Sequence, residues 1–574
     1  MRDPTPPDRD LYALTQRLVL RFTEPIPRVV NAQSPNYQQG RKDTFSVLNI
    51  VTNQVYPVSA TLQLVTDHAY WYVDDDVAFS MQDLEESARL YEERIRPQIV
   101  QVFGEELVPG VDNDTRLTIL HTPLSGLAGY FSSADEYPTQ VHPTSNQREI
   151  IYIDTSFLEL NTREYLGTLA HEFTHAVHFR ADRTEDTWVN EGLAEMGREL
   201  AGYRSSFRSS YLSSTQASLI LWSDNPSSSI PNYGGASLFM EYLAQQYGLD
   251  SLRLLMNQPA DSIQGVQAYL EAVEAQRDFR QLFADWIVAN YLDDPDDTAY
   301  GYVDQNIQVH GAYLIREPTS LEEQVEQYGV RYYTLNLDAA QATVRFQGQT
   351  QTTLLPDSLP GDGSCWWGNR GDSIDSTLTR WIDLSQQESA TLTYSLWYDI
   401  ENGWDFAYLE VSTDDGATWD ILETNHSTSR DPLGNAFGPG YTGQIGWTIE
   451  TVDLTQYAGL NVLLRFEYVT DDTVNGTGIC LGNIAINNAE LADAGWDALG
   501  FIQTDNSVSQ SYIVRVIEIG QETVVRDISL DNDQHATFTI EGLGTGIDRA
   551  IIIVSAIAEH TAVPALFNLE VAVP

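Results

Sequence analysis

The sequence predicts a multidomain α+β protein, in which a mixed α and β domain is followed by β-sandwich or jelly-roll modules. Its 574 residues exceed the length that one hydrophobic core usually serves. Helical periodicity is concentrated between about residues 80 and 315. From about residue 318, short alternating strands are separated by Gly, Asp and Asn turns, which is typical of sandwich and jelly-roll domains.

The composition is that of a folded and strongly acidic protein. Hydrophobic residues make up 42% of the chain, and 31 basic against 82 acidic residues give a net charge of −51. A surface this acidic repels nucleic acid and anionic lipid. No apolar run reaches the 18 residues or so of a membrane span. We therefore expect no nucleic acid partner and no membrane span.

Composition alone does not decide between a cytoplasmic and a secreted protein. Met1–Pro4 show no apolar core of a signal peptide, so the protein is either cytoplasmic or begins after a removed signal. Two cysteines, Cys365 and Cys480, do not by themselves indicate an oxidising environment.

Five segments are expected along the chain. The first begins Pro-rich and then alternates in 44–51 and 60–65, as strands do. The segments are an N-terminal β unit or propeptide remnant (1–65), the mixed domain (66–317), a β segment that links the modules or pairs with the last one (318–364), a jelly roll (365–485) and a C-terminal β-sandwich (486–574).

The mixed domain reads as strands first and helices later. Strands are expected at 116–120 and 149–153. Helices are expected at 82–103, 163–180, 187–201, 234–247, 262–274 and 278–292.

A His-Glu-Phe-Thr-His run lies on the helix expected at 163–180. His171 and His175 are four residues apart, a rotation of about 400°, so both imidazoles leave the same face of the helix and suit one zinc ion. Glu172 lies about 100° round from His171 and could accept a proton from a zinc-bound water. The alternative is a solvated helix with two histidines. The other faces of this helix are apolar, and burying these polar groups without a metal would be costly.

A third ligand is expected on the next helix. Fifteen residues separate His175 from Glu191, and a His, His, Glu set leaves the fourth zinc position open, as catalytic sites require. Glu195 follows one turn later and is expected to accept a hydrogen bond from a ligand histidine; the alternative is an exposed helix carboxylate. His178 is expected at the helix surface, rotated away from the metal.

These motifs resemble a known clan. The combination of the motifs at 171–175 and 190–195 resembles that of the gluzincin metallopeptidases. The sequences of 168–175 and 188–194 are similar to those of hyicolysin-type neutral metalloproteases. The resemblance implies a thermolysin-like catalytic domain that hydrolyses peptides with zinc. It also implies that His171, His175 and Glu191 are the ligands and Glu172 the base.

The same resemblance extends to the substrate side of the site. Tyr233 precedes a Gly-led helix, as does a tyrosine of gluzincin aminopeptidases, which implies that its hydroxyl stabilises the oxyanion; the alternative is a packing tyrosine. The strand 149–154 is expected as an edge that pairs with an extended peptide, and the loop 126–131 is expected to line the cleft.

A second resemblance concerns the jelly-roll segment. Residues 366–376, 397–416 and 474–478 resemble the MAM-like jelly roll of immune inhibitor A-type secreted peptidases. The resemblance implies a secreted protein whose signal peptide is absent from this sequence. Because Cys365 and Cys480 stand near the first and last strands of this module, they are expected to form a disulfide; the alternative is a pair of buried thiols.

Three aspartates of this module are candidate calcium ligands. Asp372, Asp375 and Asp405 lie in turns and offer the hard oxygen atoms that calcium prefers. The alternative is that they are ordinary β-turn aspartates.

The expected function is that of a secreted zinc endopeptidase, a monomer that cleaves protein or peptide substrates with a Glu-activated zinc-bound water. One alternative is a catalytically vestigial surface adhesin or glycan-binding protein. Another is an exopeptidase, or a hydrolase with one dedicated partner. The retention of Glu172 favours an active enzyme, because an inert scaffold needs no base.

Overall fold

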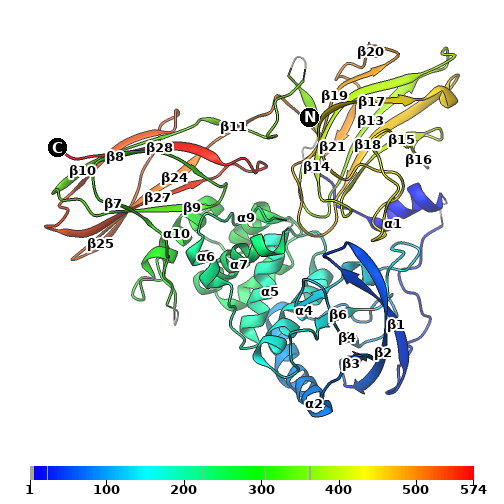
Figure 1. The fold of residues 1–574 in the computed structure, drawn as a ribbon, viewed down its shortest axis with the longest axis horizontal. Helices are drawn as coiled ribbons and strands as arrows, with labels where there is room; N and C mark the ends of the chain where they lie inside the picture. The colour runs from blue at the N-terminus through cyan, green and yellow to red at the C-terminus, as the bar shows by residue number, and fades with distance from the viewer. Residues whose placement is uncertain (1–4, 22–23, 224, 304–305, 361–362) are drawn as a thin grey trace. The chain divides into compact units, whose positions relative to one another are not determined.

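The computed structural model describes residues 5–21, 24–223, 225–303, 306–360 and 363–574 (Figure 1). Met1–Pro4, on which the signal-peptide argument rests, lie outside the described residues. The chain divides into two compact units. The first comprises Met1–Arg204, Met256–Pro259 and Leu359–Thr504, and the second comprises Ser205–Leu255, Ala260–Ser358 and Asp505–Pro574.

The first unit contains a six-stranded sheet of order β1-β2-β3-β4-β6-β5. Its strands are β1 (Lys42–Asn49), β2 (Gln54–Val65), β3 (Ala69–Asp74), β4 (Leu117–Thr122), β5 (Gly129–Phe131) and β6 (Ile150–Asp154). β3, β4 and β6 run parallel, and the outer pairings are antiparallel. The strands expected at 1–65, in an N-terminal β unit or propeptide remnant, are therefore not a sheet of their own. β2 pairs with β3, so β1 and β2 extend the sheet of the mixed domain.

The expected substrate edge is also displaced. The strand at 149–154 is not an edge, because β6 lies between β4 and β5. The Gly-rich loop expected to line the cleft supplies β5 instead, with Gly129 opposite Ile153. The rings of Tyr130 and Tyr152 stack at 4.1 Å and hold this short strand on β6. β5 is thus the outer strand at this side of the sheet.

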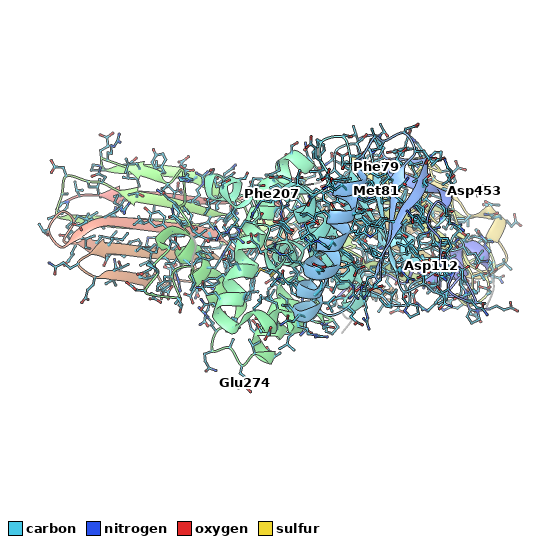
Figure 2. All side chains as sticks on the ribbon, turned by 90° about the horizontal axis from the view of Figure 1, so that it is seen from below. Phe79, Met81, Asp112, Phe207, Glu274 and Asp453 are labelled. Carbon is cyan, nitrogen blue, oxygen red and sulfur yellow. A yellow bond between two sulfur atoms is a disulfide. The ribbon has the colours of Figure 1, made fainter. Side chains whose placement is uncertain are left out.

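Three helical runs and a short 3₁₀ turn, η3 (Ser133–Glu136), accompany this sheet in the described part of the chain. Met81, labelled in Figure 2, begins a continuous helical run through α2 (Met81–Leu90), η2 (Tyr91–Ile95) and α3 (Arg96–Phe103). α4 (Arg163–Ala181) begins after Thr162, whose hydroxyl accepts from the Tyr165 amide, and it packs against β5 and β6. α5 (Thr187–Leu200) packs on α4. α4 is buried along most of its length, as expected from its apolar faces.

The jelly roll of the first unit consists of two packed sheets with a shared apolar core. One sheet has the order β17-β14-β19-β12-β22 with β20 beside β19, and the other has the order β16-β15-β18-β13-β21. The strands are β12 (Cys365–Trp367), β13 (Asp375–Asp383), β14 (Thr391–Ile400), β15 (Phe406–Ser412), β16 (Asp420–Ile421), β17 (Gly443–Asp453), β18 (Asn461–Val469), β19 (Gly478–Ile486), β20 (Ala489–Glu490), β21 (Asp497–Leu499) and β22 (Ile502–Thr504).

Two details of this module differ from or add to the expected boundaries. β21 pairs with β13 and β22 pairs with β12, so the jelly roll continues past the expected end at 485. β12 and β19 are neighbours, and a disulfide joins Cys365 to Cys480 with their Cα atoms 5.8 Å apart. The bridge therefore joins the first strand of the module to one of its central strands.

The second unit combines helices with a β-sandwich. Its helices are α6 (Arg208–Ser213), α7 (Pro226–Tyr247), η4 (Leu249–Ser251), α8 (Leu252–Met256), α9 (Ser262–Ala272) and α10 (Phe279–Leu292). Its two larger sheets have the orders β26-β10-β28-β8 and β25-β24-β27-β9-β7. The strands are β7 (Tyr313–Ile315), β8 (Thr319–Val325), β9 (Val330–Leu335), β10 (Gln341–Gly348), β24 (Tyr512–Gly520), β25 (Thr523–Asp527), β26 (His535–Glu541), β27 (Ile547–Ala556) and β28 (Ala565–Ala572).

This sandwich is assembled from two separated stretches of sequence. β8, β9 and β10 pair with strands from the last 70 residues or so, as β9 does with β27. β11 (Gln351–Thr353) pairs with β23 (Ser507–Ser509). Since β11 and β23 are partners, the jelly roll is inserted between them along the chain.

The glycine pair after Tyr233 does not begin a helix, contrary to expectation. α7 begins at Pro226, capped by the side chain of Asn225, and runs through the pair. A Cβ atom on Gly234 would lie 2.3 Å from the carbonyl oxygen of Phe207, and one on Gly235 would lie 3.1 Å from the Tyr211 ring. The glycines therefore permit close packing of α6 against α7.

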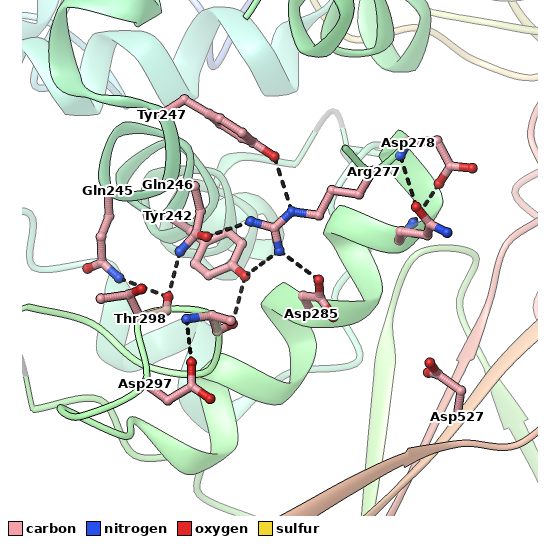
Figure 3. A network of polar contacts seen from close by, with 12 residues as sticks. Tyr242, Gln245, Gln246, Tyr247, Arg277, Asp278, Asp285, Asp297, Thr298 and Asp527 are labelled. Carbon is pink, nitrogen blue, oxygen red and sulfur yellow. Dashed lines mark hydrogen bonds and ion pairs between the residues drawn. The ribbon is translucent and has the colours of Figure 1, made fainter. Parts of the chain in front are cut away.

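A partly buried arginine joins the helices of the second unit (Figure 3). Arg277 donates to Asp285 at 2.6 Å and to the Tyr247 hydroxyl at 3.1 Å. Asp285 also accepts from Arg515 of β24 at 2.6 Å. One carboxylate thus joins α10 to the sandwich, with a positive charge on each side.

The N-terminal segment of the first unit packs on the jelly roll. Leu14 of α1 (Leu11–Leu14) and Leu18 of η1 (Thr15–Leu20) join a buried cluster with Phe406, Tyr408, Trp419 and Val469 of the jelly roll. Arg17, between these leucines, donates to Glu467 at 2.7 Å and to Asp375 at 3.1 Å. Burial raises the pKa of Glu467, but attraction to Arg17 outweighs it and holds that pKa at about 2.

We expect Arg17→Gln to lower the free energy of unfolding of the first unit by about 3–5 kcal/mol, because breaking a buried pair leaves carboxylates without a counter-charge. Urea denaturation at pH 7, followed by tryptophan fluorescence, measures this loss. The difference from wild type should shrink as the pH falls below about 4.5, since the native pKa of Glu467 lies at about 2 and the Arg17 pair is lost as that carboxylate is protonated.

Arg21→Gln is the matched control. Arg21 bonds Asp420 at 2.7 Å, but both side chains are about half exposed, so this change should cost under about 1 kcal/mol. Equal losses in the two variants would contradict the buried-pair account.

Candidate metal centre

Two helices bring three candidate metal-binding side chains together. His171 and His175 project from one face of α4, with their Nε2 atoms 3.1 Å apart. The Oε2 atom of Glu191, from α5, lies 3.1 Å from Nε2 of His171 and 3.5 Å from Nε2 of His175. One donor atom from each residue lies within 4.8 Å of the others, so a single ion can contact all three.

The far side of each imidazole is held by a hydrogen bond. Nδ1 of His175 donates to the Asn190 side-chain oxygen at 3.0 Å, and Nδ1 of His171 lies 3.0 Å from Oε1 of Glu195. In the neutral histidines this places the proton on Nδ1 and turns the Nε2 lone pairs towards each other. Two lone pairs at this separation repel unless a positive charge lies between them.

The electrostatics of the site also favour a cation. Burial lowers the pKa of His171, but hydrogen bonds with Glu191 and Glu195 raise it well above its usual value. Burial raises the pKa of Glu191, whereas His175 and His171 pull it far below its usual value. Two imidazole nitrogens and one carboxylate oxygen are the donor set of catalytic zinc, so these residues fit that ion.

Glu172 lies beside this donor set and close to β5. Its side chain is 6% exposed, and burial raises its pKa while the two histidines lower it. A Cβ atom on Gly129 would lie 3.2 Å from Cγ of Glu172 and 2.8 Å from the Tyr152 carbonyl oxygen, so only glycine fits there. The outer strand β5 thereby approaches the carboxylate that is the candidate base.

Glu195 and His178 are both buried. Glu195 is 0% exposed, which excludes the exposed-carboxylate alternative. His178 is 2% exposed and not at the helix surface, because α5 covers that face of α4. Its Nδ1 atom lies 3.0 Å from the Asn190 oxygen, and burial lowers its pKa to about 4.

Asn190 is the residue that the sequence analysis missed. Its side-chain oxygen accepts from His175 and His178, so it orients the candidate ligand His175. Its position directly before Glu191, on the helix that carries the third ligand, was the available signal.

The other candidate residues are described by their own surroundings. Tyr233 is in the second unit, with its ring 4.7 Å from that of Trp222 and 5.3 Å from that of Phe207. The three candidate calcium ligands do not form one group. Asp372 accepts from Thr187, Asp375 accepts from Arg17, and Asp405 lies with Glu401 and Asp471, with one donor oxygen from each within 4.8 Å.

Comparison with known proteins supports part of this picture. The family described as "Immune inhibitor A-like, MAM domain" matches residues 338–506. Pre-pro-metalloprotease PrtV of Vibrio cholerae serotype O1 is 27% identical over 129 residues, which are 22% of this chain and 13% of that protein. Immune inhibitor A of Bacillus thuringiensis subsp. alesti is 29% identical over 129 residues, again 22% of this chain and 17% of that protein.

The matched segment spans less than one fifth of the length of these relatives. The expected MAM-like jelly roll is confirmed, and the chain has distant homology to metalloproteases. None of the described helices is long and apolar enough to cross a membrane.

We expect Asn190→Ala to weaken zinc binding by about 10–100-fold, because His175 loses the acceptor that fixes its orientation. Competition with a chromophoric chelator measures the affinity. Glu199→Gln, more than two turns further along α5, is the control and should bind zinc as wild type does. An unchanged affinity in Asn190→Ala would show that the Asn190 contact does not orient the ligand.

Proposed function

We propose that this protein is a secreted zinc-dependent peptidase, most simply an endopeptidase, with a gluzincin catalytic domain of the hyicolysin type whose sheet includes β1 and β2. The observation that carries the proposal is the convergence of His171, His175 and Glu191 with Glu172 alongside them. The distant metalloprotease relatives support the same reaction class.

The reaction needs a base, an acid and a positive centre. When bound, zinc would supply the positive charge that polarises a scissile carbonyl and acidifies water. Glu172 accepts the proton of the attacking water and passes it to the leaving amine. Its buried position keeps bulk water from competing for that proton. Glu195 and Asn190 keep the imidazoles in the orientation that binds metal.

The substrate is proposed to pair with β5. This outer strand lies against α4 through Gly129, so an extended peptide added to it would run past Glu172. Tyr233 keeps its proposed role as oxyanion donor, although its aromatic contacts alone also suit a packing tyrosine.

Two properties of the jelly roll support the proposal that the protein is secreted. The disulfide between Cys365 and Cys480 suits an oxidising compartment, and the relatives that share the MAM-like segment include a pre-pro-metalloprotease. We propose a monomer that acts on protein or peptide substrates and binds no nucleic acid, given the net charge of −51.

Calcium is proposed for only one of the three candidate aspartates. Asp405 is 0% exposed, and its Oδ2 atom accepts no hydrogen bond from the described residues. Glu401 and Asp471 face it, which gives the oxygen-rich setting that calcium prefers.

The alternative of a vestigial adhesin or glycan-binding protein has less support. It leaves unexplained why the buried Glu172 lies beside two histidines and a second carboxylate, at the cost of desolvating these four groups.

We expect Glu172→Gln to lower kcat for casein hydrolysis by at least about 100-fold while leaving the zinc content stoichiometric, because the change removes the base and spares the ligands. Metal analysis and a casein assay on the same preparation measure both quantities.

Glu164→Gln is the matched control, since Glu164 lies exposed in the first turn of the same helix. It should retain wild-type activity. Wild-type hydrolysis by Glu172→Gln, or a wild-type protein without stoichiometric zinc, would refute the peptidase mechanism.

A further inference from the structure

The helix that carries Glu191 receives its N-terminal cap from the jelly roll. α5 begins at Thr187, and Asp186 at the N-cap position gives it no side-chain cap within the described part of the chain. Asp372 supplies one instead. Its Oδ2 atom accepts from the Thr187 amide at 2.7 Å and from the Thr187 hydroxyl at 2.6 Å. These residues are 185 positions apart in the sequence.

Further hydrogen bonds reinforce the contact between Asp372 and the start of α5. The Asp372 amide donates to Oδ1 of Asp186 at 3.2 Å. The Thr187 hydroxyl accepts from the Val474 amide at 2.9 Å, and Asn475 donates to Oδ1 of Asp372 at 2.7 Å. Both carboxylate oxygens of Asp372 are therefore engaged, and its position is fixed from two loops of the jelly roll.

The contact is also buried and electrostatically suited to a helix start. Asp372 is 2% exposed and Thr187 is 6% exposed. The first amides of a helix have no partner within the helix, and a carboxylate there satisfies them and complements the helix dipole. Burial and the nearby Asp186 raise the pKa of Asp372 to about 6, so it stays largely ionised at neutral pH.

Thr187 stands one helical turn before Glu191. Residues four apart share a face of the helix, so the first turn that Asp372 holds is the turn that presents Glu191 and Asn190 to the histidines. Fraying of that turn would displace the third metal donor and the residue that orients His175.

We propose that Asp372 is a positioning residue of the metal centre, through which the MAM-like jelly roll fixes the helix that carries Glu191. The inference rests on the proposed function only in taking Glu191 as a zinc ligand. Asp372 has no part in the chemical step. It sets how well the third donor is placed before metal arrives.

The test compares Asp372→Ala and Asp372→Asn with Asp399→Asn in the full chain. Asp399 belongs to the same jelly roll and accepts from the Thr477 hydroxyl at 2.9 Å, so it controls for damage to that module. Two quantities are measured: zinc affinity by chelator competition, and amide hydrogen exchange of residues 187–191 in the metal-free protein by mass spectrometry.

For Asp372→Ala we expect zinc affinity about 5–10-fold weaker and faster exchange at the start of α5. Asp372→Asn should stay within about threefold, because an amide oxygen can still accept from Thr187. Asp399→Asn should match wild type in both measurements. Zinc affinity of Asp372→Ala within twofold of wild type, or an equal loss in Asp399→Asn, would overturn the proposal.

Two further outcomes are covered. If Asp372→Ala does not fold, the Thr187→Val variant tests whether this contact fixes the start of α5. It removes the hydroxyl bonds but keeps the capped amide, and it should speed exchange at 187–191, whereas unchanged exchange overturns the proposal. If the wild type binds no zinc, the peptidase mechanism fails, but exchange in the metal-free variants still shows whether Asp372 fixes the helix.

Discussion

The close approach of α5 to α4 is the constraint on which the candidate metal centre depends. A Cβ atom on Gly197 would lie 1.9 Å from the Thr174 hydroxyl oxygen, so no larger residue fits between the two helices. Thr174 is fully buried between the two histidines in sequence, and its hydroxyl donates back to the Ala170 carbonyl at 2.8 Å. Because interiors are close-packed, this contact fixes the distance from Glu191 to the imidazoles.

Packing alone would leave the imidazoles free to rotate, and polar contacts remove that freedom. Asn190 and Glu195 lie five positions apart on α5, and they hold the Nδ1 atoms of His175 and His171, respectively. The same helix thus supplies a donor and both orienting groups. A shift of α5 along α4 would disturb all three together, which makes the placement of this one helix decisive for metal binding.

Local patterns predicted much of this arrangement. The four-residue spacing of His171 and His175 dictates a shared helix face, and α4 and α5 lie within a residue of their expected limits. The outer strand β5 was missed because it has only three residues and reads as a Gly-rich loop. The cap from Asp372 could not be foreseen, since no periodicity links residues 185 positions apart. The same holds for Arg17 and Glu467, which are 450 positions apart.

These distant contacts make the jelly roll a structural part of the first unit and not a separate accessory module. Arg17 inserts among its carboxylates, Asp372 caps α5, and His142 from the segment between β5 and β6 lies 3.0 Å from the Asn435 side-chain oxygen. Each contact would leave a buried polar or charged group unpaired if the jelly roll were removed. The boundary that a shift in sequence pattern suggests at about residue 318 therefore separates secondary-structure types but not folding units. The sheet and helices around the candidate metal centre, with α5 among them, therefore share one compact unit with a segment more than 150 residues further along the chain.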